Sequence, residues 1–281
     1  MRQSNGEFVG QGGLKIRYQL WEPEHLRGNL VLSHGAAEYS GRYEHVAAWF
    51  CEQGFAVWAL DHRGHGRSEG KRMHVDHFDH YLEDLHAFVK IATEKYGRPI
   101  LVGHSMGGLI AYRYALIHSG MLAGLVLSSP WFRTKMKLPP VAKALAPVVA
   151  AIAPTAKAGA AIPPEYCTKN TAMLERDAKD SLIVRGSTVG WFMQCSRAQE
   201  PCFHGSTLPP GLPVLFMQAG EDKLADPEAT RTVFERVAHA QKSFQLYPEK
   251  YHEIFNDPGY EDVFRDLLAW LEEQGLVAPK L

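Results

Sequence analysis

The 281-residue sequence has little cysteine, no surplus of either charge and no apolar run of membrane-spanning length. Its 30 Lys and Arg side chains almost balance 31 Asp and Glu side chains, which gives a formal net charge of -1 and no basic surplus of the kind that binds nucleic acid. The uncharged stretch between Lys143 and Lys157 holds about 13 residues and contains Pro147 and Pro154, whereas a transmembrane helix needs about 20. We therefore expect neither a nucleic-acid partner nor a transmembrane helix.

The four cysteines do not follow metal-ligand spacing, and a chain of this length needs no disulfide framework. They are Cys51, Cys167, Cys195 and Cys202. We expect free thiols in a reducing environment, with a bond between the last two as the alternative. Residues 1–7 contain no apolar segment typical of a secretory leader. The predicted location is therefore the cytoplasm.

Short apolar runs alternate with helical patterns early in the chain and again near its end. The expected strands are 14–21, 30–32, 55–60, 100–102, 122–127, 214–217 and 244–247. The expected helices are 43–53, 78–96, the segment after Ser105, 227–239 and 260–274. Strands that alternate with helices favour an α/β fold with a mostly parallel sheet covered on both faces.

This alternation stops in the middle of the chain, where alanine, proline and scattered aromatic residues dominate. We interpret 131–205 as a helical cap inserted into a core formed by 1–130 and 206–281. The apolar part of the cap, 138–162, is expected to pack against that core. The alternative is an exposed rim that makes transient contact with micelles or membranes.

The segment Gly-His-Ser-Met-Gly at 103–107 directly follows a predicted buried strand and precedes a helical pattern. This arrangement is typical of a nucleophile elbow, a sharp turn that raises a serine hydroxyl above the edge of a sheet. Glycines two residues before and after the serine avoid a steric clash across the turn. Ser105 is therefore the candidate nucleophile.

A serine nucleophile needs a base and a group that orients the base, and both should follow later strands of the sheet. Asp222 lies just after the strand at 214–217, and His252 follows the strand at 244–247. We predict these two residues as the acid and the base. Glu221 and Asp226 compete for the acid role, but Asp226 precedes Pro227 in the manner of a helix N-cap.

Ester hydrolysis also needs hydrogen-bond donors for the oxyanion. The strand at 30–32 ends in Ser-His-Gly-Ala-Ala, a turn that allows backbone amides to point outward. We predict the N–H groups of Ala36 and Met106 as the two donors. His34 is expected to brace this loop rather than to move protons.

Taken together, these segments resemble the monoacylglycerol lipase group of the α/β-hydrolase superfamily. The matching stretches are 33–43, 61–70, 103–108, 219–223 and 247–256. The resemblance implies an α/β-hydrolase fold, a Ser–His–Asp triad at the positions above, and a helical cap with an acyl tunnel. It also implies a serine hydrolase that splits monoacylglycerols into fatty acid and glycerol without a cofactor.

The same resemblance implies that Glu38, Arg42 and His104 line the polar end of the substrate site. The alternative for the first two is a salt bridge at i, i+4 that fixes the loop. Tyr39 departs from the group, whose members usually have histidine after the glutamate, so the selectivity for the head group is open.

Other functions remain open on the same residues. Within the esterases, the alternatives are a lysophospholipase and a short-chain carboxylesterase. An acyltransferase, a peptidase and a catalytically silent ligand-binding hydrolase fold are further alternatives. The glycine-rich segment 64–70 is expected to form a structural turn, and His74, His77 and His80 are not expected to bind a metal.

Overall fold

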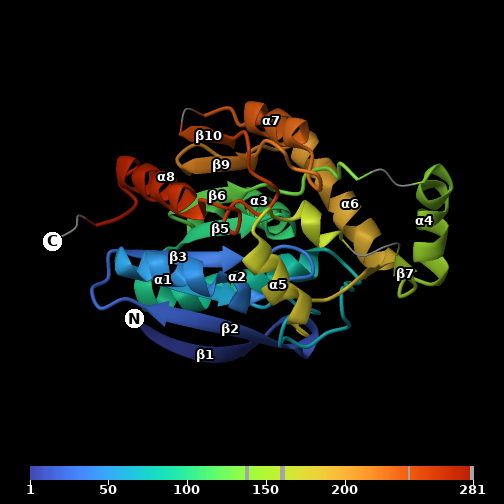
Figure 1. Cartoon of the computed structure of the whole chain (residues 1–281), viewed down its shortest axis with the longest axis horizontal. Coiled ribbons are helices and arrows are strands. Elements are labelled where there is room, and N and C mark those ends of the chain that lie inside the picture. The colour runs from blue at the N-terminus through green and yellow to red at the C-terminus, as the bar shows by residue number, and fades with distance from the viewer. Residues whose placement is uncertain (137–138, 159–161, 240, 279–281) are drawn as a thin grey trace.

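A central sheet of eight strands organises the computed structural model, which describes residues 1–136, 139–158, 162–239 and 241–278 (Figure 1). Its strand order is β1-β2-β4-β3-β5-β6-β9-β10. The strands are β1 (Arg2–Val9), β2 (Lys15–Glu22), β3 (Gly28–Ser33), β4 (Phe55–Leu60), β5 (Ile100–His104), β6 (Gly124–Ser128), β9 (Val214–Ala219) and β10 (Lys242–Tyr247). From β4 to β10 all neighbours run parallel, and the pairs β1–β2 and β2–β4 are antiparallel.

Helices cover both faces of this sheet and bury two separate apolar clusters against it. One face carries α2 (Asp79–Tyr96), α3 (Met106–His118), α6 (Val189–Phe203) and α7 (Pro227–Arg236). The other face carries α1 (Glu44–Glu52) and α8 (Tyr260–Glu273). The inner strands, such as β4, are buried along their whole length, as expected for a parallel sheet between two helical layers. The predicted α/β architecture is confirmed.

The edge strand β1 was not predicted from the sequence. This strand pairs with β2 over its full length, but most of its side chains are exposed. A strand whose two faces are both exposed to solvent lacks the alternation of apolar and polar residues by which strands are recognised. The other predicted strands and helices are present, with ends that differ by up to three residues.

Between β6 and β9 the chain forms α4 (Pro140–Ile152), α5 (Thr171–Lys179) and α6, together with a pair of two-residue strands, β7 (Lys157–Ala158) and β8 (Ser187–Thr188). Of these helices, α6 joins the main core, because Trp191 and Cys195 are buried against α2 and α3. Figure 1 shows α4 at the edge of the molecule, away from the sheet.

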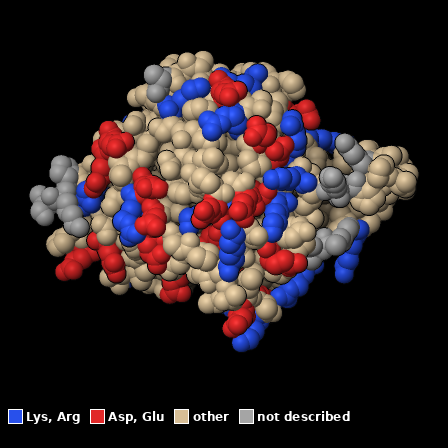
Figure 2. Space-filling view, turned by 45° about the horizontal axis from the view of Figure 1, so that its top comes forward, with Lys and Arg blue, Asp and Glu red and all other residues tan. Residues whose placement is uncertain are grey.

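The expectation that the apolar stretch 138–162 packs against the core is wrong for α4. Val141, Leu145, Val148 and Ile152 are 70%, 53%, 57% and 80% exposed. A helix with apolar residues on several sides cannot bury all of them when it packs against one neighbour, here α6. Positions 138 and 159–161 of this stretch lie outside the described residues. Figure 2 shows the α4 end of the molecule as a mostly uncharged surface.

Cys195 and Cys202 lie seven residues apart on α6, so helical geometry separates them by about 10 Å. A disulfide requires Cα atoms closer than about 7 Å. All four thiols are free, which confirms the prediction. Within the described ranges, every helix is too short or too polar to cross a bilayer.

Candidate active site

Ser105 lies between β5 and α3 in a strained backbone conformation, with φ 52° and ψ -115°. A Cβ atom added at Gly103 would come within 2.4 Å of the Gly107 carbonyl oxygen, and one added at Gly107 would come within 2.0 Å of the Ser33 carbonyl oxygen. Both glycines are therefore needed for the turn to pack against the end of β3. This geometry holds the serine at the end of the parallel sheet.

His252 and Asp222 meet beside this turn. The Nδ1 atom of His252 donates to Oδ2 of Asp222 over 2.7 Å, and both side chains are buried. The other carboxylate oxygen accepts the N–H groups of Leu224 and Ala225, at 2.8 and 2.9 Å. Two backbone donors thus fix the carboxylate so that its second oxygen faces the imidazole.

The two groups shift each other's pKa. Burial alone would raise the pKa of Asp222, but the charge and hydrogen bond of His252, together with the two backbone N–H groups, lower it below its ordinary value. Burial alone would lower the pKa of His252, but Asp222, with smaller contributions from Glu253 and Glu38, raises it above its ordinary value. The charged form of the imidazole is therefore more favourable beside Asp222 than it would be for a buried histidine without this partner.

His104 lies next to both Ser105 and His252. Its ring centroid lies 4.8 Å from that of His252, and it directly precedes Ser105. Burial and the proximity of His252 lower its pKa to about 3, so His104 is neutral at physiological pH. Among the described residues, no hydrogen bond joins the Ser105 hydroxyl to His252, and such catalytic contacts often tighten only when substrate binds.

The two predicted oxyanion donors lie on either side of this turn. Met106 is the first residue of α3, and Ala36 lies in the loop after β3. Within the described part of the chain, neither N–H group donates to a protein acceptor. Both N–H groups are therefore available to an oxyanion. The N–H of Met106 lies at the positive N-terminal end of the α3 dipole, and the N–H of Ala36 belongs to the neighbouring loop.

The contacts of His34 confirm its predicted bracing role. Its Nε2 atom accepts the N–H of His62 over 2.9 Å, so Nδ1 carries the proton and donates to the carbonyl of Gly35 over 2.7 Å. That carbonyl belongs to the same peptide group as the N–H of Ala36. His34 therefore fixes the plane in which the predicted oxyanion donor points.

Arg42 joins three carboxylates that come from distant parts of the chain. It forms ion pairs with Glu38 at 2.5 Å, with Glu253 at 2.8 Å and with Asp177 of α5. The salt bridge between Glu38 and Arg42, the alternative from the sequence, is thus present. Glu38 also accepts the N–H of Gly35 over 2.7 Å and lies 3.9 Å from Nε2 of His104.

Glu253 was not predicted from the sequence. Burial alone would raise its pKa, but Arg42 outweighs this effect and holds the pKa at about 2. Glu253 directly follows His252, and this adjacency is the only local signal of its importance. Its partner Arg42 is 211 residues away in the sequence.

The other acidic candidates have different partners. Glu221 pairs with Lys169 at 3.1 Å on the surface. Asp226 caps α7 by accepting the N–H of Glu228, which confirms its predicted N-cap role. Asp222 is thus the candidate acid that contacts His252.

The segment 64–70 forms a tight turn, as predicted. Gly64 and Gly66 have positive φ angles of 71° and 48°, and the Asp61 carboxylate accepts the N–H groups of Ser40 and Arg67. These hydrogen bonds give the turn a structural role. In the part of the chain that the structure describes, no group of His, Cys, Asp and Glu side chains is arranged to hold a metal ion.

Comparison with known proteins identifies the family. The profile of the serine aminopeptidase S33 family matches residues 24–259. A monoacylglycerol lipase of Mycolicibacterium smegmatis is 33% identical over 96% of this chain and 97% of its own length. This chain belongs to the monoacylglycerol lipase group of the α/β-hydrolases. It is a carboxylic ester hydrolase.

Two further members of the wider family are similar along nearly their whole length. A Bacillus subtilis phospholipase is 31% identical over 90% of this chain and 98% of its own length. The crystal structure of a Paleococcus ferrophilus monoacylglycerol lipase superposes with a TM-score of 0.78 at 29% identity, covering 98% of this chain and all of that one (100%). The predicted α/β-hydrolase fold is thus confirmed.

Proposed function

We propose that this lipase-group hydrolase splits monoacylglycerols into a fatty acid and glycerol, with Ser105 as nucleophile, His252 as base and Asp222 as orienting acid. The observation that carries the proposal is the 2.7 Å hydrogen bond between His252 and Asp222 beside the elbow that presents Ser105. A buried, oriented imidazole is the group that a serine needs to become a nucleophile at neutral pH.

In the first half of the reaction, Oγ of Ser105 attacks the ester carbonyl carbon while Nε2 of His252 takes the hydroxyl proton. The N–H groups of Ala36 and Met106 donate to the oxyanion that forms. When the tetrahedral intermediate collapses, glycerol leaves with the proton from His252 and an acyl-enzyme remains. Water, deprotonated by His252, then attacks the acyl group and releases the fatty acid.

The charges at the polar end favour a neutral head group. Glu38, Glu253 and Asp177 surround the single cation of Arg42. This acidic surplus would repel the phosphate of a lysophospholipid but would accept the hydroxyl groups of glycerol. We therefore propose that Glu38, Arg42 and His104 form the polar end, with Arg42 held by its ion pairs rather than free to bind substrate.

Lysophospholipid hydrolysis is the second candidate because a phospholipase is among the similar proteins. A substrate panel separates the two candidates. It compares a monoacylglycerol, a lysophospholipid of the same acyl chain, a short-chain ester and an aminoacyl amide. We expect the highest kcat/KM for the monoacylglycerol. A preference for the lysophospholipid would overturn the proposed substrate, and cleavage of the amide alone would indicate a peptidase.

Replacement of the nucleophile tests the mechanism. Ser105→Ala should lower turnover by on the order of 10⁴-fold or more, because the attacking group is lost. A fluorophosphonate probe should label the unmodified protein but not this variant. Ser119→Ala, at the other end of α3, is the matched control and should react normally. Near-native activity or labelling in the Ser105 variant would contradict the assignment.

We further propose that 131–205 acts as the cap and that the exposed apolar side chains of α4 make transient contact with lipid micelles or membranes. Leu145, Val148 and Ile152 are 53–80% exposed, and monomeric soluble proteins rarely expose such a cluster of apolar side chains. This exposure supports the proposed contact. The four free thiols support a cytoplasmic location.

A further inference from the structure

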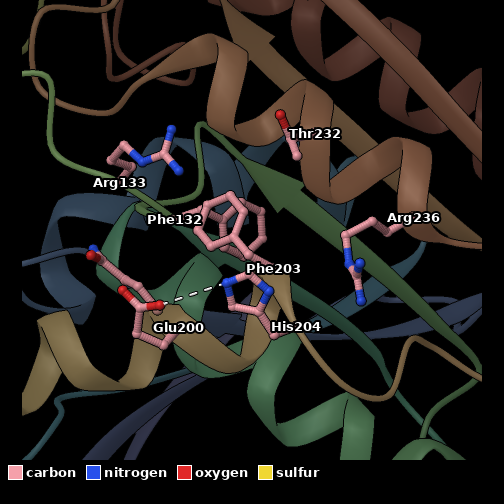
Figure 3. A pocket seen from close by; sticks show the side chains of 8 residues that line it. Phe132, Arg133, Glu200, Phe203, His204, Thr232 and Arg236 are labelled. Atoms are coloured by element: carbon pink, nitrogen blue, oxygen red, sulfur yellow. Dashed lines mark ion pairs between the residues drawn. The ribbon is translucent and has the colours of Figure 1, made fainter.

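A cavity that Ser105 does not line lies between the C-terminal end of α6 and α7 (Figure 3). Its volume is about 430 Å³, within the range of roughly 300–1,000 Å³ typical of small-molecule sites. Phe132 and Phe203 form its apolar surface. Phe132 is 1% exposed and belongs to the main core, so this side of the cavity is rigid.

Two arginines face this apolar surface from opposite sides (Figure 3). The guanidinium group of Arg133 stacks 4.7 Å from the Phe203 ring centroid, and its ion pair with Asp226 is long, at 3.8 Å. Arg236 donates one hydrogen bond, to the carbonyl of Gly205 over 3.1 Å. A guanidinium has five N–H donors, so both groups retain donors for a ligand.

Among the residues that line the cavity, cationic side chains outnumber carboxylates, and Asp226, the partner of Arg133, lies outside this lining. Arg133 and Arg236 are opposed by one lining carboxylate, Glu200, which lies 3.9 Å from His204. A cation above an aromatic ring, as Arg133 lies above Phe203, suits a ligand that combines an anionic head with an apolar body. Because Arg side chains bind the two oxygens of a carboxylate in a planar fork, an amphiphilic carboxylate matches this lining.

One wall of the cavity is connected to the catalytic residues. The N–H of Trp131 donates to the Ser105 carbonyl over 2.9 Å. Four residues later, Lys135 donates to the carbonyl of Asp222 over 2.8 Å. Between them, the Arg133 carbonyl accepts the N–H of Asp226 over 3.0 Å. The loop that carries Arg133 thus contacts both the elbow and the acid loop.

We propose that this cavity binds a free fatty acid, whose carboxylate is attracted by Arg133 and Arg236 and whose alkyl chain lies against Phe132 and Phe203. A bound carboxylate competes with Asp226 for Arg133 and loosens the contacts that hold the acid loop, so occupancy lowers kcat. The identity of this acid as the enzyme's own product rests on the proposed function; binding itself does not.

Calorimetric titration of octanoate into the full-length Ser105→Ala protein tests binding without turnover. We expect Arg236→Gln and Arg133→Gln each to weaken octanoate binding at the cavity by at least about fivefold, through loss of a charged hydrogen bond. Arg231→Gln is the matched control: it lies on α7, its guanidinium covers Phe244, and it does not line the cavity. Octan-1-ol, which has the same chain without the charge, should bind equally to all variants.

Inhibition kinetics with a soluble short-chain ester test the coupling. Octanoate should lower kcat of the unmodified enzyme as well as compete at the acyl site, and acetate should do neither. In Arg236→Gln the effect on kcat should disappear while the competitive component remains. Purely competitive inhibition, equal in all variants, or equal calorimetric affinity in the Arg236 and Arg231 variants, would overturn the proposal. If the unmodified protein binds octanoate but hydrolyses no ester, the proposed function is overturned instead.

Discussion

Two helices of the same insertion, α4 and α5, are attached to the molecule in opposite ways. The apolar helix α4 exposes Val141, Leu145 and Ile152 to solvent. The polar helix α5 has no buried residue, yet Asp177 near its end pairs with the buried Arg42. Apolar composition therefore does not tell which segment of the insertion is bound to the core.

Directional bonds hold α5 at both of its ends. Before the helix, the N–H of Lys169 donates to Asp257 over 2.6 Å and the Asn170 side chain donates to the Asn256 carbonyl over 3.1 Å, both in the loop that carries His252. After it, Asp180 accepts the hydroxyl of Tyr39 over 2.6 Å. Thus α5 connects the loop of the candidate base to the loop of the candidate oxyanion donor, whereas α4 contacts mainly α6.

The largest expected effect comes from removing the shared cation of this connection. Arg42→Ala leaves Glu38 and Glu253 buried without their partner and should lower the free energy of unfolding by about 3–5 kcal/mol. Urea denaturation measures the change. Arg176→Ala, which removes an exposed partner of Asp177, should cost less than about 1 kcal/mol. Equal losses in the two variants would remove the distinction between the anchored and the free helix.

The next largest effect is expected in a series of stability measurements at different pH values. The buried His34 fixes the loop that binds α5, whereas α4 contains no histidine. Burial lowers the pKa of His34 from 6.5 to about 4. Its neutral form therefore stabilises the fold above pH 6.5, and this contribution, on the order of 3 kcal/mol, is lost as the pH falls toward 4. The free energy of unfolding from urea denaturation should fall across this window.

His252 has the opposite sign. Its raised pKa stabilises the fold below pH 6.5, and this contribution is lost as the pH rises through the raised value. A stability that stays flat from pH 6.5 to 4 would contradict the role assigned to His34.

A smaller effect is expected at the contact between Tyr39 and Asp180. Tyr39→Phe removes the hydroxyl that donates to Asp180 and should cost about 1 kcal/mol. A double-mutant cycle with Asp180→Ala isolates this bond, because each single change removes the same interaction. Additive losses from the two changes would show that Tyr39 does not tether the segment after α5.

The smallest effect on stability is expected on α4. Leu145→Ser combined with Val148→Ser should change the free energy of unfolding by no more than about 0.5 kcal/mol, because both side chains are already exposed. The same variant should bind phosphatidylcholine vesicles about tenfold more weakly, since it removes apolar surface from the proposed contact. Ala172→Ser on α5 is the control. Unchanged vesicle binding would refute lipid contact through α4.

The elbow around Ser105 could be predicted because its determinants are local. Gly103 and Gly107 lie within two residues of the serine, and the clash that they avoid follows from the turn itself. Asp222 and His252 could be predicted because each directly follows a recognisable strand, and parallel strands bring their carboxyl ends to one edge of the sheet. Their hydrogen bond completes an arrangement that topology already implied.

The partners of Arg42 could not be predicted in the same way. Glu38 is four residues away and was paired with it as an alternative, but Asp177 and Glu253 lie 135 and 211 residues away. No periodicity links such positions. Packing of α4 against the core was favoured over the alternative of an exposed rim, and the exposed rim is what the structure has. An apolar pattern does not tell whether the fold provides a surface to cover a helix.

The sequence by itself determined the order of the core strands and helices after β1, the strained serine turn and the loops that carry the acid and the base. Each of these depends on steric or apolar patterns a few residues long. Only the tertiary structure decided which charges meet at Arg42, that α5 is bound and α4 is exposed, and that Arg133 and Arg236 face one cavity. Those features depend on contacts between segments far apart in the chain, whose proximity the packing of the whole fold creates.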